Sequence, residues 1–182
     1  MKGIVFNLLE EVVVNELGAD KWDELLDAAG VDGIYTSLGN YPDAEVVKLV
    51  AAGAAALSIS EAEVLRWFGR KAMPLLVQRY PVFFTHHKNT RNFVLTLNTV
   101  IHHEVEKLYP GSSPPPFEFD MSREDLLVMH YRSHRRLCHL AHGFIEGAGD
   151  YYGETVECEQ LVCMHSGAQL CTFHLTFRPK AH

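Results

Sequence analysis

The chain has 182 residues, which fits one domain with room for a smaller lobe, and apolar residues make up 47% of it, enough to bury a core. Its formal net charge of −7 argues against nucleic-acid binding, and no apolar run approaches the roughly 18–20 residues needed to span a membrane. Glu10 and Glu11 interrupt the apolar start, and no small-residue cleavage site follows, so this start is not typical of a signal peptide. We therefore expect a cytoplasmic protein whose four cysteines stay reduced or bind metal.

The first half of the chain reads as helical. Apolar residues recur at helical spacing over residues 4–17. Pro42 stands at a favoured first-turn position for another helix, and Ser60 with Glu63 has the spacing of a capping box that opens a third. Pro74 lies within or near the end of that third pattern, so a kink is expected there.

The second half mixes helices and strands. Residues 89–109 have a helical pattern, and the run PGSSPPPF stops it because consecutive prolines cannot continue a helix. Residues 125–133 read as a strand and residues 135–152 as a helix. Residues 154–165 and 170–177 alternate like two strands around a turn. The predicted fold class is α+β, with an N-terminal helical lobe and a second lobe of helices and a mainly antiparallel sheet.

Two neighbouring histidines occur in the helical pattern VIHHEV. His102 lies beside the apolar seam of Ile101 and Val105, whereas His103 faces a more polar side. A histidine at the edge of an apolar face is usually a satisfied core residue, so the sequence around His102 does not by itself predict a metal ligand.

Three polar residues alternate directly after an apolar run, at Tyr131, Ser133 and Arg135. On an extended strand these positions share one face, where two hydroxyls and a guanidinium would form a clamp for negatively charged oxygens. An ordinary polar strand face is the alternative interpretation. Together with a buried imidazole and an apolar helical lobe, the clamp suggests a haem pocket, with one axial histidine and an anchor for both propionates.

The chain resembles the haem-nitric oxide/oxygen binding (H-NOX) family over essentially its whole length. The likeness is carried by MKGIVFNLLEE, FGR…YP, VIHHEVEKLYPGSSPPP, Tyr131-x-Ser133-x-Arg135 and CMHSGAQLC. The resemblance implies one H-NOX domain over residues 1–182, with a distal helical subdomain at 1–65, a proximal α+β subdomain at 66–182, and haem b between them. It also implies that His102 is the axial ligand, that the triplet binds the propionates, and that Pro115 presses on the haem and distorts it.

The resemblance further implies a sensor of the bacterial stand-alone type rather than an enzyme. Ferrous haem would bind NO, and also CO, and weakening or release of the iron–histidine bond would signal to a separate protein, a histidine kinase or a cyclic-di-GMP enzyme. Members that bind O₂ carry a tyrosine on the helix after the triplet, at the position of Leu140 here. The expected distal wall is apolar and consists of Val5, Leu9, Leu76, Leu140 and Phe144.

Four cysteines lie in the last third of the chain. Cys163 and Cys171 are each four residues from Gly167, so in a tight hairpin they would face each other across the strands. Cys158 falls on the opposite face of a regular strand and would need a bulge to join them. Cys138 would come from the preceding helix.

Some family members bind zinc in this region, and Gln160 stands here where another ligand often occurs. The resemblance thus implies a structural zinc on Cys138, Cys163 and Cys171, with Cys158 as the first choice for the fourth ligand and His165 or His139 behind it. Four reduced thiols without metal are the alternative. At the level of function, a thiol–zinc redox sensor is the alternative to the haem sensor. An enzyme with a catalytic non-haem metal ranks last, because the sequence has no clear two-histidine-plus-carboxylate group.

Overall fold

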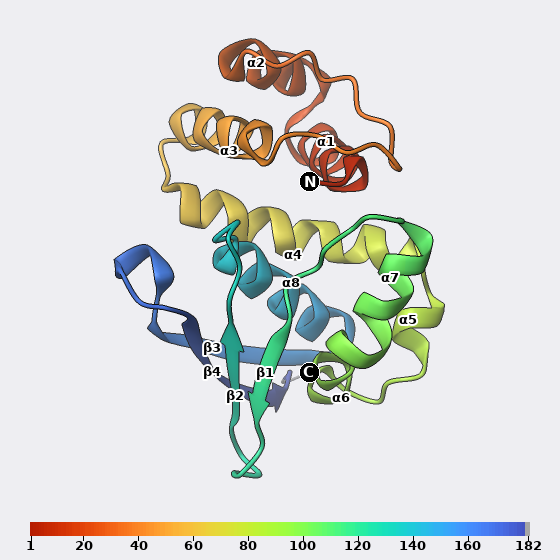
Figure 1. Cartoon of the computed structure of the whole chain (residues 1–182), viewed down its shortest axis with the longest axis vertical. Coiled ribbons are helices and arrows are strands. Elements are labelled where there is room, and N and C mark those ends of the chain that lie inside the picture. The colour runs from red at the N-terminus through yellow and green to blue at the C-terminus, as the bar shows by residue number, and fades with distance from the viewer. Residues whose placement is uncertain (181–182) are drawn as a thin grey trace.

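The computed structural model describes residues 1–180, in which helices and a four-stranded antiparallel sheet make up the fold (Figure 1). The α+β prediction is confirmed. The sheet has the order β1-β2-β4-β3, with β1 (Phe117–Asp120), β2 (Leu127–Tyr131), β3 (Glu154–Val162) and β4 (Cys171–Pro179). The helices are α1 (Gly3–Leu17), α2 (Ala19–Ala29), α3 (Asp43–Leu57), α4 (Glu61–Arg79), α5 (Val82–Thr85), α6 (Thr90–Leu95), α7 (His102–Leu108) and α8 (Cys138–Tyr151), with a π-helical turn η1 (Leu97–Ile101) and a 3-10 turn η2 (Met164–Ser166).

The first three helices lie together on one side of α4 and form an N-terminal core (Figure 1). Phe6 of α1, Trp22 of α2 and Val46 of α3 are buried in it. The predicted capping box opens α4, since Ser60 Oγ accepts the N–H of Glu63 at 3.2 Å and the Glu63 carboxylate accepts the N–H of Ser60 at 2.8 Å. Within the described residues, no helix is both long and apolar enough to cross a bilayer.

Helix α4 belongs to both lobes. Val64, Leu65, Phe68 and Ala72 are buried in the N-terminal core, whereas Met73 is buried in the C-terminal core. The helix continues through Pro74 and ends at Arg79. The subdomain boundary expected between residues 65 and 66 therefore falls inside a continuous helix, and it stays a prediction.

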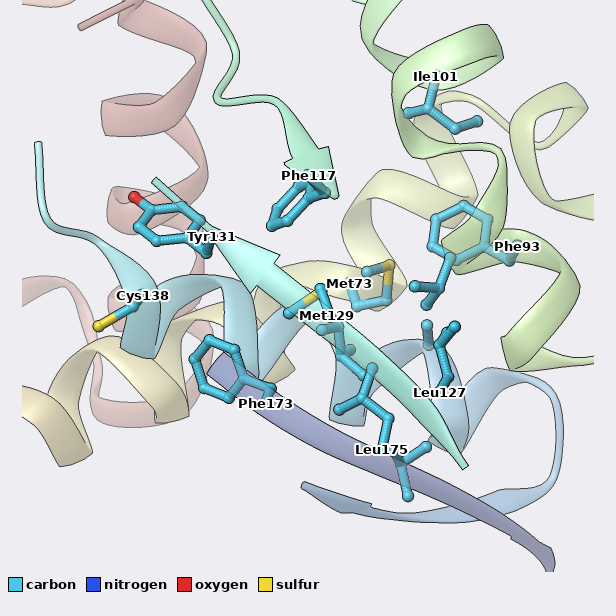
Figure 2. Packing of buried hydrophobic residues seen from close by; sticks show 14 of the residues in the cluster. Met73, Phe93, Ile101, Phe117, Leu127, Met129, Tyr131, Cys138, Phe173 and Leu175 are labelled. Carbon is cyan, nitrogen blue, oxygen red and sulfur yellow. The ribbon is translucent and has the colours of Figure 1, made fainter. Parts of the chain in front are cut away.

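The C-terminal core lies between the sheet and helices α4, α6 and α8 (Figure 2). Side chains alternate along β2, so that Leu127, Met129 and Tyr131 point into this core. Phe173 and Leu175 of the neighbouring strand β4 meet them and are fully buried. This core supports one wall of the cavity described below.

Helices α4 and α8 pack with their backbones in close approach. A Cβ atom at Gly143 would lie 2.0 Å from the carbonyl oxygen of Arg66, and one at Gly69 would lie 2.5 Å from the carbonyl oxygen of Leu140. Beside this contact, the guanidinium of Arg66 binds the carboxylate of Glu146. The crossing fixes α8, and with it Leu140, against the N-terminal lobe.

The helix expected over residues 89–109 is interrupted. Helix α6 ends before Thr96, whose carbonyl accepts the N–H groups of both Val100 and Ile101 at 2.9 and 3.1 Å. The second of these bonds is the i→i+5 bond of a π turn, which inserts one extra residue. Because each helical residue turns the chain by about 100°, the insertion changes the face on which His102 emerges at the start of α7.

Candidate functional site

A cavity of about 360 Å³ lies between the two lobes. Helices α1, α4 and α8 supply one part of its wall, and η1, α7, the segment before β1, and β2 supply another. Its surface is almost entirely apolar. The residues expected at a haem site that line this cavity are Val5, Leu76, His102, Pro115, Tyr131, Ser133, Arg135, Leu140 and Phe144.

Leu9 does not line this cavity, and this part of the expected distal wall is wrong. Its side chain is buried in the N-terminal core, while Ile4, Val5 and Leu8 supply the α1 face of the cavity. The reason is helical periodicity, since Leu9 points about 100° away from Leu8 around the helix axis. Residues Val12 and Val13 continue the face to which Leu9 belongs.

His102 is the first residue of α7, directly after the π turn. Its ring lies over one wall of the cavity, with its centroid 5.7 Å from that of Phe117. Burial lowers the pKa of His102 to about 4. The imidazole is therefore neutral at neutral pH, with a nitrogen lone pair free to bind a metal.

The triplet reaches the cavity by a route that the sequence did not predict. Strand β2 ends at Tyr131, so Ser133 and Arg135 are not on a strand and do not share a strand face with it. The chain turns instead: Ser133 Oγ accepts the N–H of Arg135 at 3.2 Å, and Arg136 adopts a positive φ of 52°. All three triplet side chains still line the cavity, and the hydroxyl of Tyr131 accepts the N–H of Leu137 at 3.0 Å.

Asp43 is a partner of the triplet that sequence reasoning missed. Arg135 Nε donates to Asp43 Oδ2 at 3.0 Å, and its Nη1 donates to the Ser113 carbonyl at 2.9 Å. Although burial opposes it, hydrogen bonds from the Met1 amino group and Arg135 hold the pKa of Asp43 below its ordinary value. In the sequence Asp43 had only the signal of an acidic residue in a first helical turn, which is common.

Two tyrosines on the cavity wall were also missed. Tyr80 follows the end of α4 and Tyr109 follows the end of α7, and their hydroxyls form a hydrogen bond with each other. Burial, together with this hydrogen bond, raises the pKa of Tyr109. By contrast, His139 and His142, which flank Leu140 in the sequence, are not among the cavity-lining residues in the described part of the chain.

A second group of potential ligands lies at the start of α8. Cys138 and Cys163 have sulfur atoms 4.0 Å apart, and the ligand atoms of these two residues and His139 all lie within 4.8 Å of one another. Cys171, which is buried beside these thiols, accepts the N–H of Met164 at 3.3 Å. Burial raises the pKa of Cys138 to about 12, so without a metal this thiol is protonated.

Cys158 is not part of this group, so its selection as the first choice for a fourth ligand is wrong. It pairs with Leu175 across β3 and β4 and faces Arg66 and Glu146. The register shift in β3 occurs between Gln160 and Val162, after Cys158, and therefore cannot turn Cys158 toward the other thiols.

The comparisons with known proteins agree with this geometry. Residues 2–160 match the haem-NO-binding family. The chain belongs to this family. A crystal structure of an H-NOX protein from S. oneidensis in the Fe(II)NO state is similar, with 31% identity, a TM-score of 0.91, and coverage of 98% of this chain and 99% of that one.

Two further H-NOX structures share the fold. An NMR structure of an H-NOX domain from Shewanella oneidensis in the Fe(II)CO state has 30% identity and a TM-score of 0.88, and covers 99% of this chain and 100% of that one. The unliganded Fe(II) H-NOX protein from K. algicida has 22% identity and a TM-score of 0.88, covering 100% and 99% of the two chains. At that identity the likeness concerns the fold alone.

Proposed function

We propose that this H-NOX domain is a haem-based sensor of NO, with ferrous haem b in the cavity between the lobes. The observation that carries the proposal is the placement of one neutral imidazole, His102, and one anion-binding guanidinium, Arg135, on the wall of a single apolar cavity. A metalloporphyrin needs these three features together: an axial nitrogen, a cation for its carboxylates, and apolar walls. The match to the haem-NO-binding family supports the same assignment.

The polar residues would bind two different parts of the haem, the iron and the propionates. His102 presents a neutral nitrogen to the iron, and burial keeps that nitrogen unprotonated. Tyr131, Ser133 and Arg135 would bind the propionates. Arg135 already bridges Asp43 and the Ser113 carbonyl, which orients its guanidinium before any ligand arrives. Pro115, in the segment between α7 and β1, would lie against the macrocycle.

The distal wall accounts for the choice of gas. When bound, haem supplies a ferrous iron that binds diatomic gases. Leu140, Leu76 and Phe144 line the cavity without a hydrogen-bond donor. O₂ depends on such a donor more than NO or CO does, because its outer oxygen gains more negative charge. This wall therefore favours NO and CO over O₂.

His102 would transmit the signal. With His102 on the iron, α7 would be tethered to the cavity. Weakening or release of that bond on NO binding would free α7 and let the two lobes shift relative to each other. A ligand can move such an equilibrium only through its different affinity for the two states, and loss of the bond supplies that difference. We propose that a histidine kinase or a cyclic-di-GMP enzyme, acting as a separate chain, reads the shift.

Absorption spectra of the purified protein test the proposal. We expect a Soret band, a five-coordinate ferrous state, and a change on addition of NO. His102→Gly should abolish the five-coordinate ferrous spectrum, and imidazole should restore it, whereas the neighbouring His103→Gly should leave it unchanged. A low-spin six-coordinate spectrum of the reduced protein, or equal effects of the two substitutions, would contradict the assignment.

The thiol group near α8 favours a second candidate function, a zinc-dependent or thiol-based redox response. We infer a structural zinc held by Cys138, Cys163 and His139, whose ligand atoms lie within 4.8 Å of one another, with the neighbouring Cys171 as the fourth ligand. Thiolates and imidazole in a set of four suit tetrahedral zinc. Elemental analysis should find zinc in the wild type and in Cys158→Ser. The same analysis should find it depleted in Cys138→Ser, Cys163→Ser and Cys171→Ser. Full zinc content in Cys163→Ser would contradict this set.

A further inference from the structure

Asn98, the second residue of the π turn, makes a paired contact with the backbone of one residue across the fold. Its Nδ2 donates to the carbonyl of Phe117, and its Oδ1 accepts the N–H of Phe117 at 2.9 Å. An amide side chain that satisfies both backbone groups of one residue fixes position and orientation more tightly than a single hydrogen bond does. This paired contact joins η1 to the first residue of β1.

Phe117 lies where several parts of the proposed haem site meet. It follows Pro115 by two residues and pairs with Tyr131 across β1 and β2. The two aromatic rings have their centroids 5.8 Å apart, and Figure 2 shows them beside each other. His102 stands four residues after Asn98, with its ring 5.7 Å from that of Phe117. One side chain thus connects the turn that carries His102 to the Pro115 segment and to the strand of Tyr131.

Helix α7 itself is lightly packed. Among residues 102–108, all of which the structure describes, none is buried. Ile101 before the helix and Tyr109 after it are buried, and Val105 packs against the C-terminal core. His102, Val105 and Leu108 line the cavity. At the His102 end, the Asn98 contact adds a polar link from the π turn to β1.

We propose that Asn98 is a positioning residue that holds His102 at the distance needed to bind the iron. This inference rests on the proposed haem site. Without the paired contact, the π turn separates from β1 more easily and carries His102 away from the cavity. Substitution of Asn98 should then favour release of His102 when NO binds, while the propionate clamp and the distal wall remain intact.

The test compares Asn98→Ala with Asn7→Ala. Asn7 is a matched control because its Nδ2 donates to a backbone carbonyl, that of Tyr35 at 3.0 Å, in the other lobe. In ferrous protein, resonance Raman spectra report the iron–histidine stretch, and absorption after NO addition reports the ratio of five- to six-coordinate iron. We expect Asn98→Ala to weaken the stretch and to raise this ratio roughly tenfold, the effect of about one lost pair of hydrogen bonds, whereas Asn7→Ala changes neither.

A second readout needs no haem. In the haem-free protein, amide hydrogen exchange over residues 97–105 should be roughly tenfold faster in Asn98→Ala than in Asn7→Ala. If Asn98→Ala does not fold, Asn98→Asp keeps the acceptor for the Phe117 N–H and should give a smaller change in the same direction. Unchanged exchange, or an unchanged iron–histidine stretch and coordination ratio, would overturn the inference. A spectrum insensitive to His102→Gly would instead refute the haem site itself, and the exchange measurement would still decide whether the contact restrains the turn.

Discussion

Replacing Arg135 with alanine should weaken haem retention far more than the same change at Arg132 or Arg136. The side chain of Arg135 is 19% exposed and lines the cavity, whereas Arg132 and Arg136 are exposed residues outside it. Nε and Nη1 are already engaged by Asp43 and the Ser113 carbonyl, which leaves the remaining nitrogen for a propionate. We therefore count about one charge-assisted hydrogen bond, worth about 1.5–3 kcal/mol, or roughly ten- to a hundredfold in affinity.

Haem transfer to an excess of apomyoglobin measures this loss as a dissociation rate. We expect the rate to rise roughly ten- to a hundredfold for Arg135→Ala and less than about fivefold for the two control variants, since exposed charges contribute at most about 1 kcal/mol. Circular dichroism of each haem-free variant checks that the fold is kept. Equal rates in all three variants would mean that net positive charge, and not a specific clamp, retains the haem.

Four further outcomes follow from the structure. In air, the reduced protein should form no lasting O₂ complex, and a lasting O₂ spectrum in the wild type would refute the apolar distal wall. Leu140→Tyr should slow oxidation and lengthen the lifetime of the O₂ complex by roughly tenfold or more. Gly143→Ala should lower the thermal midpoint sharply, because its Cβ would lie 2.0 Å from a backbone oxygen, whereas Gly53→Ala, with its nearest contact at 3.5 Å, should be tolerated or stabilise α3 by up to about 1 kcal/mol. Burial lowers the pKa of His142 to about 4, so the unfolded state binds the proton first as pH falls. The haem-free protein should therefore lose about 2 kcal/mol of stability from this group between pH 7 and pH 5. In urea titrations, His142→Gln should remove that part of the loss. The pKa of Asp43 is held low by its partners in the folded state, so its contribution is present above its unfolded value and lost as pH falls through the folded one; Asp43→Asn should flatten the acid limb of the stability curve.

The sequence predicted the class of the fold because its local signals were consistent. Helical spacing, the Ser60–Glu63 capping box and the alternation in β2 and β4 each depend on neighbours a few residues away. The end of β2 was not predictable in this way. The pairing of β2 with β1 and with β4 ends at Tyr131 in both cases. The chain therefore loses its hydrogen-bonding neighbours there, although Ser133 and Arg135 keep the alternating pattern.

The π turn before His102 escaped prediction for a related reason. Over five residues, an apolar pattern of period 3.6 is hard to distinguish from one with a single inserted residue. The turn is also held by a contact from Asn98 to Phe117, which lies 19 positions later in the chain. The thiol group shows the same limit. The facing of Cys163 and Cys171 across a hairpin stays a prediction, since the ligand atoms that lie within 4.8 Å of one another are those of Cys138, His139 and Cys163. The choice between Cys158 and His139 depended on how α8 packs against β3.

Asp43 and Arg135 are 92 positions apart, and their ion pair crosses between the lobes. Asp43 belongs to α3 in the N-terminal lobe, while Arg135 follows β2 in the C-terminal lobe. A displacement of one lobe relative to the other therefore has to stretch this ion pair or carry Arg135 with it. Arg135 is also the cation of the proposed propionate clamp. A displacement of the lobes would therefore act on a bound haem at its carboxylates as well as at its bond to His102. His102 and Arg135, which suggested a haem site in the sequence, thus connect such a site to helix α7 and, through Asp43, to the N-terminal lobe.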